Sequence, residues 1–149
     1  RYHGVLKSSV GTDVISLNVK FSSGVIGGKP AFYDLFDLYT TEDESVRSGY
    51  SARELFARDF TMMNAELRFG IFNAAIPPII TIRFEGFFFA DMAYLSGTRK
   101  DMFSQPMKDA YGAGVRVLFD SPVYAYFSFS YGLNRDKDGR FVFAGTAGF

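Results

Sequence analysis

Apolar side chains recur at every second residue through much of this chain, and that period limits its fold more than any other feature. In one clear run, Phe127, Phe129 and Tyr131 share one parity, while Ser128 and Ser130 share the other. Successive side chains of a β-strand point to opposite faces, whereas a helix returns to the same face about every 3.6 residues. The alternation therefore predicts an all-β protein.

Two-faced runs of this kind divide the chain into eight predicted strands. They are placed at residues 2–10, 13–22, 31–39, 59–72, 79–93, 110–120, 123–133 and 139–149. No segment requires a helix, and the length of 149 residues fits one domain. An even number of strands lets an up-and-down antiparallel sheet close, so we predict one eight-stranded β-barrel domain spanning residues 1–149.

The two faces of the predicted strands differ in polarity in a way that is unusual for a soluble protein. The 18 Phe and 9 Tyr contribute many rings to one, largely apolar face. The opposite face carries acids and bases in close succession, namely Glu66, Arg68, Arg83, Glu85, Asp91, Arg116 and Arg140. A soluble sandwich would turn its charges outward and its rings inward. We therefore predict a transmembrane barrel whose apolar face meets lipid and whose charged face lines a narrow lumen.

The apolar runs are too short for the other common way of crossing a bilayer. The longest, residues 74–80, contains Pro77 and Pro78, whereas a membrane-spanning helix needs about 20 residues.

The predicted connectors between strands alternate in length. They are short at 23–30, 73–78 and 121–122 and long at 40–58 and 94–109. Outer-membrane barrels have short periplasmic turns and long external loops, which places the terminal Phe149 at the periplasmic rim.

One loop motif is similar to that of a known family. Val46, Arg47, Gly49 and Tyr50, with Ser48 inserted, resemble the Val-Arg-Gly-Phe/Tyr motif of the BamA-type superfamily. That superfamily comprises outer-membrane protein assembly and two-partner-secretion barrels. In it, the motif lies on a long extracellular loop that folds into the barrel, and the resemblance implies the same position here.

A second motif implies a partner for that loop. Phe89 and Asp91 belong to a sequence that is similar to the family's Phe-x-Asp-x-Gly motif, with Ala93 replacing the glycine. In the family this aspartate pairs with the loop arginine. The resemblance therefore implies that the loop at residues 40–58 is held in the lumen by a salt bridge between Arg47 and Asp91. Asp91 independently falls on the charged face of its predicted strand.

The resemblance also implies a location and a function. It indicates the outer membrane of a bacterium, or of an organelle derived from one, and the insertion or translocation of proteins. A terminal strand ending in Phe149 is similar to the assembly signals of many outer-membrane proteins. Two alternatives stay open, namely a structural or anchoring barrel without insertase activity and a channel assembled from more than one copy. The expected partners are outer-membrane lipid, unfolded client proteins and further copies of the chain.

Other functions receive little support from the residues present. Lys plus Arg number 16 and balance 16 Asp plus Glu, so no global field favours nucleic acid. His3 is the only histidine and cysteine is absent, which argues against a histidine-dependent triad or a multi-histidine metal site. Residues 42–44 and 136–139 could bind calcium, but they are most simply a solvated loop and a hairpin turn. We expect no enzyme activity, no metal and no cofactor.

Overall fold

The chain forms an antiparallel all-β fold, as predicted. The structure, a computed structural model, describes residues 1–28, 31, 34–38, 45–47, 50, 54–76, 80–96, 106–120 and 124–148. The strands are β1 (Tyr2–Gly11), β2 (Ile15–Val25), β3 (Phe36–Asp37), β4 (Phe56–Ala57), β5 (Asp59–Ile76), β6 (Ile80–Ser96), β7 (Lys108–Asp120), β8 (Tyr124–Leu133) and β9 (Gly139–Gly148). Within the described ranges, no helix is long and apolar enough to cross a membrane.

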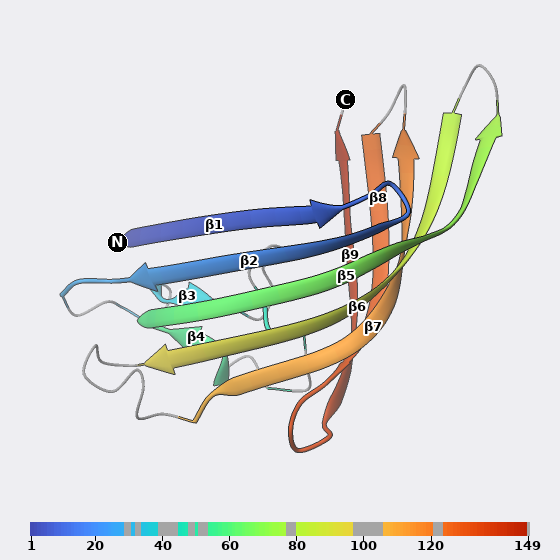
Figure 1. Cartoon of the computed structure of the whole chain (residues 1–149). Helices are drawn as coiled ribbons and strands as arrows, with labels where there is room; N and C mark the ends of the chain where they lie inside the picture. Colours follow the sequence, from blue (N-terminus) through green and yellow to red (C-terminus); the bar gives the residue numbers. More distant parts are fainter. Residues whose placement is uncertain are drawn as a thin grey trace.

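Seven of these strands form one sheet that curls without closing. Their order is β1-β2-β5-β6-β7-β8-β9, and every neighbouring pair is antiparallel. Figure 1 shows that β1 and β2 at one edge run at a steep angle to β8 and β9 at the other. The edge strands β1 and β9 are not hydrogen-bonded to each other. The sheet is therefore open, which corrects the prediction of a closed eight-stranded barrel.

The predicted strand at 31–39 is wrong, and this accounts for the odd number. Of its described residues, only Phe36–Asp37 form a strand, and they pair with β4 in a separate two-stranded sheet. Phe36 packs onto the main sheet at Gly24, where a Cβ would lie 2.5 Å from the Phe36 ring. Seven alternating strands leave β1 and β9 pointing the same way. Antiparallel closure of this sheet would require an odd number of further strands.

The connectors alternate in length as predicted, but their bounds differ: residues 73–76 belong to β5, 94–96 to β6 and 108–109 to β7. The links 12–14, 77–79 and 121–123 join strand ends at one end of the main sheet, and the links 26–58, 97–107 and 134–138 join strand ends at the opposite end. The predicted short link at 23–30 is instead part of the connector 26–58, which contains β3 and β4 and is called the inner loop below. β9 runs toward the short-connector end, while Phe149 lies outside the described residues.

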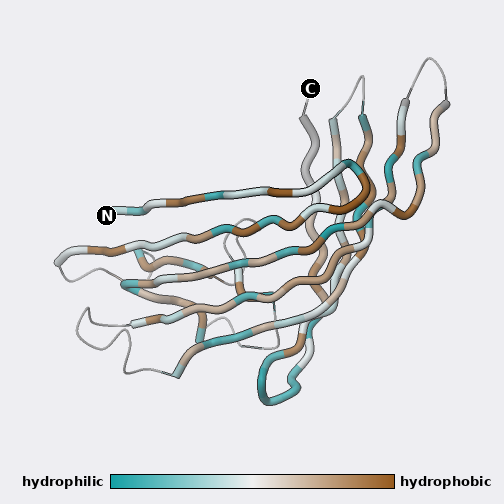
Figure 2. Tube along the Cα trace, in the orientation of Figure 1, coloured by the Kyte–Doolittle hydropathy of each residue, from teal (hydrophilic) through white to brown (hydrophobic). Residues whose placement is uncertain are grey.

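The two faces of the sheet carry the predicted split in polarity. Large rings of β8 and β9 remain exposed on the outer face, including Phe127 at 46%, Phe141 at 64% and Phe143 at 70%. They stack in pairs, with 5.3 Å between the ring centroids of Phe129 and Phe141. Apolar and polar segments alternate along the strands in Figure 2. The sheet thus presents an apolar outer surface and a charged inner one.

The hydrophobic core lies on the inner side of the curl. It joins Leu38, Val46 and Leu55 of the inner loop to Phe60 and Met62 of β5, and each of these is at most 1% exposed. Within the loop, the Leu38 amide donates to the Leu55 carbonyl at 3.1 Å and the Val46 amide to the Leu38 carbonyl at 3.0 Å. This packing fixes the residue that follows Val46 against the sheet.

Candidate functional site

The inner loop is attached to the sheet by an ion pair between Arg47 and Asp91 of β6. Nε of Arg47 donates to Oδ2 of Asp91 at 3.0 Å and Nη2 donates to Oδ1 at 2.9 Å, which is a bidentate pair. The backbone amide of Arg47 donates to the same Oδ2 at 3.0 Å. The Asp91 side chain is 0% exposed and that of Arg47 is 15% exposed. Three donors from one loop residue therefore converge on one buried carboxylate.

Asn64 of β5 connects this pair to the loop from the other side. Its Nδ2 donates to Oδ1 of Asp91 at 2.8 Å and to the carbonyl oxygen of Ser45 at 3.2 Å. Asn64 lies directly opposite Asp91 in the pairing of β5 with β6. Asp91 thus accepts four hydrogen bonds, which compensates a carboxylate for the loss of water.

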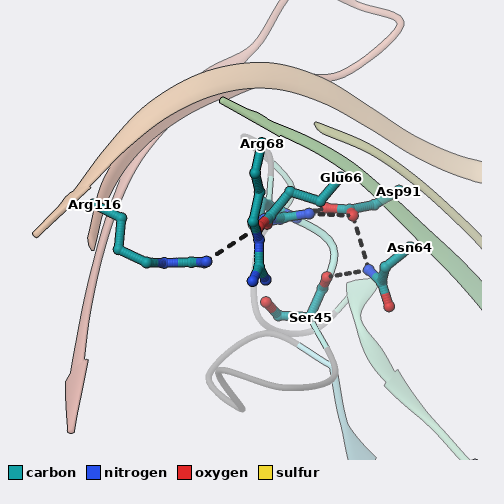
Figure 3. Close-up of polar contacts among 7 residues, drawn as sticks. Ser45, Asn64, Glu66, Arg68, Asp91 and Arg116 are labelled. Atoms are coloured by element: carbon teal, nitrogen blue, oxygen red, sulfur yellow. Dashed lines mark hydrogen bonds and ion pairs between the residues drawn. The ribbon is translucent and has the colours of Figure 1, made fainter. Parts of the chain in front are cut away.

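Glu66, the next inward-facing residue of β5, is shared by three arginines. It accepts from Nη1 of Arg47 at 2.8 Å, forms an ion pair with Nε of Arg68, and lies 3.3 Å from Nη2 of Arg116. Figure 3 shows Arg68 and Arg116 approaching Glu66 from different strands, with Asp91, Asn64 and Ser45 beside it. The network links the inner loop to β5, β6 and β7 at once.

Aromatic rings and glycines form the floor of this network. The guanidinium of Arg47 lies over the ring of Phe89, with its Cζ 3.9 Å from the ring centroid. The Phe89 ring in turn lies across Gly112 of β7, where an added Cβ would come within 2.7 Å of Cζ. At Gly132 of β8, a Cβ would lie 1.7 Å from the carbonyl oxygen of Arg47. Glycine is therefore required at residue 132 for the loop backbone to lie this close.

Tyr50 provides a second attachment point at the start of β7. Its hydroxyl donates to Oδ1 of Asp109 at 3.2 Å and accepts from the Asp109 amide at 3.4 Å. Nζ of Lys108 lies 4.4 Å from the Tyr50 ring centroid. Burial raises the pKa of the Tyr50 phenol, and the nearby Asp109 carboxylate adds to the rise. The hydroxyl therefore stays protonated and able to donate.

The structure places the remaining predicted residues in different surroundings. Val46 is 0% exposed and belongs to the core, so its role in the loop motif is to pack. Arg83 pairs with Asp120 at 2.7 Å, apart from the network, and Glu85 lies opposite Arg116 in the β6–β7 pairing. Arg140 of β9 lies on the inner face across from β1 and β2. Gly49 is outside the described residues, as Phe149 is.

The strand pattern places Asn64 on the charged face but predicts no contact for it, and Gly132 and Asp109 were not predicted as site residues, although Gly132 also carries a readable signal. Asn64 shares the parity of Glu66, so it falls on the charged face. Gly132 interrupts a strand, and a strand-interior glycine indicates that another backbone approaches closely. Neither signal identifies the partner residue, because the contacts are distant in the sequence: Asn64 bonds to residues 19 and 27 positions away, and Gly132 lies against Arg47.

The chemistry of the site suits attachment better than metal binding. In the portion of the chain that the structure describes, no group of three or more His, Cys, Asp or Glu side chains could hold a metal ion. The carboxylates of Asp91 and Glu66 are instead occupied by guanidinium and amide donors. The arrangement is a buried lock that holds a long loop against the inner wall of a sheet.

Fold and site together define a class: an all-β protein with an apolar outer face, whose longest connector folds back and is locked by a buried Arg–Asp pair. The comparison with protein-family models supplies the family. The model of the Omp85 superfamily domain matches residues 3–148, and the chain belongs to that superfamily. Omp85 proteins are associated with outer membranes and with protein insertion or translocation. No curated protein and no solved structure matches this chain.

Proposed function

We propose that the chain forms part of an outer-membrane barrel that inserts or translocates client proteins, with the inner loop as its central working element. The observation that carries this proposal is the lock on Arg47, in which Asp91 and Glu66 bind all three guanidinium nitrogens. Breaking one side of a buried ion pair costs about 3–5 kcal/mol. A loop held this firmly keeps a fixed position, and its release is a discrete event.

The membrane location is supported by the outer face of the sheet. The rings exposed there, among them Phe127, Phe141 and Phe143, would contact lipid hydrocarbon. The inward charges would then line an enclosed space. Lipid is the first partner in this proposal, and unfolded client proteins are the second.

Closure of the barrel is part of the proposal and restricts which strands complete it. β1 and β9 point the same way, so an odd number of additional strands gives antiparallel pairing at both edges. Two copies of this sheet in the same orientation would meet at two parallel seams. A homo-oligomeric channel built from these seven strands alone is therefore the less favourable route to closure.

The test is client assembly with Arg47→Ala, using the protein in its assembled state in liposomes. An unfolded outer-membrane barrel serves as the client, and its folding is followed by the gel shift between heated and unheated samples. We expect at least a tenfold loss of assembly rate with Arg47→Ala. Arg83→Ala is the matched control, because Arg83 pairs with Asp120 outside the lock and is 39% exposed. Full activity of a folded Arg47→Ala protein would refute the working-loop proposal.

A structural or anchoring barrel is the second candidate, and the same network favours it. Asp91 accepts four hydrogen bonds, which is equally suited to a loop that never moves. Under this alternative, Arg47→Ala lowers the thermal stability of the protein, but the rate of client assembly per folded protein is unchanged. Measuring both quantities on the same samples separates the two candidates.

A further inference from the structure

The inner side of the sheet contains a trough whose charge differs from that of the whole chain. Its volume is about 890 Å³, and its walls come from β1 and β2 on one side and β9 on the other. Among the residues that the structure describes, six Lys and Arg line it, against one acidic residue, Glu66. The six are Lys7, Lys20, Arg47, Arg68, Arg116 and Arg140. The described lining of the trough is thus more basic than the chain as a whole.

Arg116, on the floor of this trough, has unused capacity to bind an anion. Its Nε is buried and has no hydrogen-bond partner among the described atoms. Its guanidinium Cζ lies 5.2 Å from the ring centroid of Phe87 and 5.5 Å from that of Tyr126. Glu66, whose Oε1 lies 3.3 Å from Nη2 of Arg116, also binds Arg47 and Arg68, and Glu85 lies opposite Arg116 in the β6–β7 pairing. A ligand carboxylate at Arg116 would supply the acceptor that its buried Nε lacks.

The distribution of the cations indicates the shape of the ligand. Lys7 lies directly opposite Lys20 in the β1–β2 pairing, whereas Arg140 belongs to β9 and Arg116 to β7. The charges are thus spread over both walls and the floor. A single small anion would occupy a minor part of a trough of this volume, since one water molecule takes about 30 Å³. An extended ligand with several negative groups would contact all of them.

We propose that this trough binds an acidic segment of an extended polypeptide, with Arg116 and Arg140 as its principal contacts. The inference rests on the proposed function, in which an unfolded client chain enters the enclosed space. Carboxylate side chains match the fork of an arginine guanidinium, and serine hydroxyls such as Ser9 and Ser128 line the same trough. A concave surface lined by one sign of charge also concentrates ligands of the opposite sign.

The experiment measures peptide binding by fluorescence anisotropy, with the folded protein in detergent. The probe is a labelled nine-residue peptide of alternating Glu and Ser, compared with the matching Gln–Ser and Lys–Ser peptides. We expect the Glu–Ser peptide to bind at least tenfold more tightly than the Gln–Ser peptide, and to weaken as salt is raised. The double variant Arg116→Gln/Arg140→Gln should lose at least tenfold in affinity. Arg83→Gln, which removes an equal charge from an arginine that does not line the trough, should lose none.

A second variant keeps the test valid if the double variant does not fold. That variant is the single substitution Arg140→Gln, because Arg140 lies on β9, outside the ion pairs of Glu66. It should still lower the affinity for the Glu–Ser peptide several-fold. Equal binding of the three peptides, or an equal loss with Arg83→Gln, would overturn the proposal. So would saturable binding of inorganic phosphate without binding of the Glu–Ser peptide, which would indicate a compact anion site.

One competitor for the trough is the chain's own acidic run at 42–44, which lies outside the described residues. If the Glu–Ser peptide binds only after Glu42→Gln, Asp43→Asn and Glu44→Gln are introduced together, the trough is filled from within the chain and the proposal fails. Peptide binding is measured without client assembly. If the Glu–Ser peptide does not bind while the wild-type protein remains active in the client-assembly assay, the acidic-peptide proposal fails and the proposed function stands.

Discussion

Gly132→Ala should release the inner loop although residue 132 belongs to neither recognised motif. The added Cβ would lie 1.7 Å from the carbonyl oxygen of Arg47, whereas carbon and oxygen atoms normally approach to about 3.3–3.6 Å. The loop backbone must therefore shift by roughly 1.6–1.9 Å, the difference between those separations. A shift of that size takes the 3.0 Å bond from the Arg47 amide to Asp91 beyond hydrogen-bond distance.

The magnitude follows from the two ways in which the structure can respond. If the sheet yields, the cost is that of overpacking, about 1–3 kcal/mol. If the loop moves away, the cost approaches that of breaking a buried ion pair, about 3–5 kcal/mol. We expect about 3 kcal/mol, which corresponds to a roughly hundredfold rise in the population with the loop released.

The assay is the rate of limited proteolysis within residues 26–58 of the folded protein. This rate follows the population of the released loop when docking is fast compared with cleavage. Gly4→Ala is the matched control, because an added Cβ at residue 4 meets nothing within 4 Å. An unchanged cleavage rate in Gly132→Ala would show that the loop does not lie against β8 as the structure places it.

Two further predictions use the same proteolysis assay. Asp91→Asn removes a fully buried carboxylate and should speed cleavage at least a hundredfold, because a buried pair loses about 3–5 kcal/mol when one partner is removed. Asp120→Asn, in a partly exposed pair, should change the rate less than about fivefold; similar rates for the two variants would contradict the account. Tyr50→Phe removes the hydroxyl bonded to Asp109 and should raise the rate about fivefold, for a hydrogen bond of about 1 kcal/mol. Tyr111→Phe, on the exposed outer face, should leave the cleavage rate unchanged. If Tyr111→Phe raised the rate as much as Tyr50→Phe, the Tyr50 hydroxyl would have no specific role in holding the loop.

Much of the sheet was predictable because each strand carries its own two-faced pattern. The pattern placed Phe127 and Phe143 outside and Glu66 and Asp91 inside, as the structure has them. It failed at 31–39, where Phe36 and Leu38 are buried by packing onto the sheet rather than by pairing within it. Parity reports which face a residue occupies. It does not report whether a segment lies in the sheet or on top of it, and so the strand count was wrong by one.

The candidate site was predictable only where a motif or a parity identified it. Arg47 and Asp91 came from the resemblance, and the structure brings them together. The sharing of Glu66 among three arginines was not predictable, because it depends on how far the sheet curls and on where the loop crosses it. The need for glycine at 132 is likewise visible only when the loop is in place.

The central claim, that a buried ion pair locks the inner loop to the sheet, is tested most directly by a double-mutant cycle on Arg47 and Asp91. The cycle compares the free energy of loop release, from proteolysis within residues 26–58, for Arg47→Ala, Asp91→Ala and the double variant. We expect the double variant to be little worse than either single one, with a coupling energy of at least about 2 kcal/mol. Additive effects with no coupling would show that the two side chains do not hold the loop together.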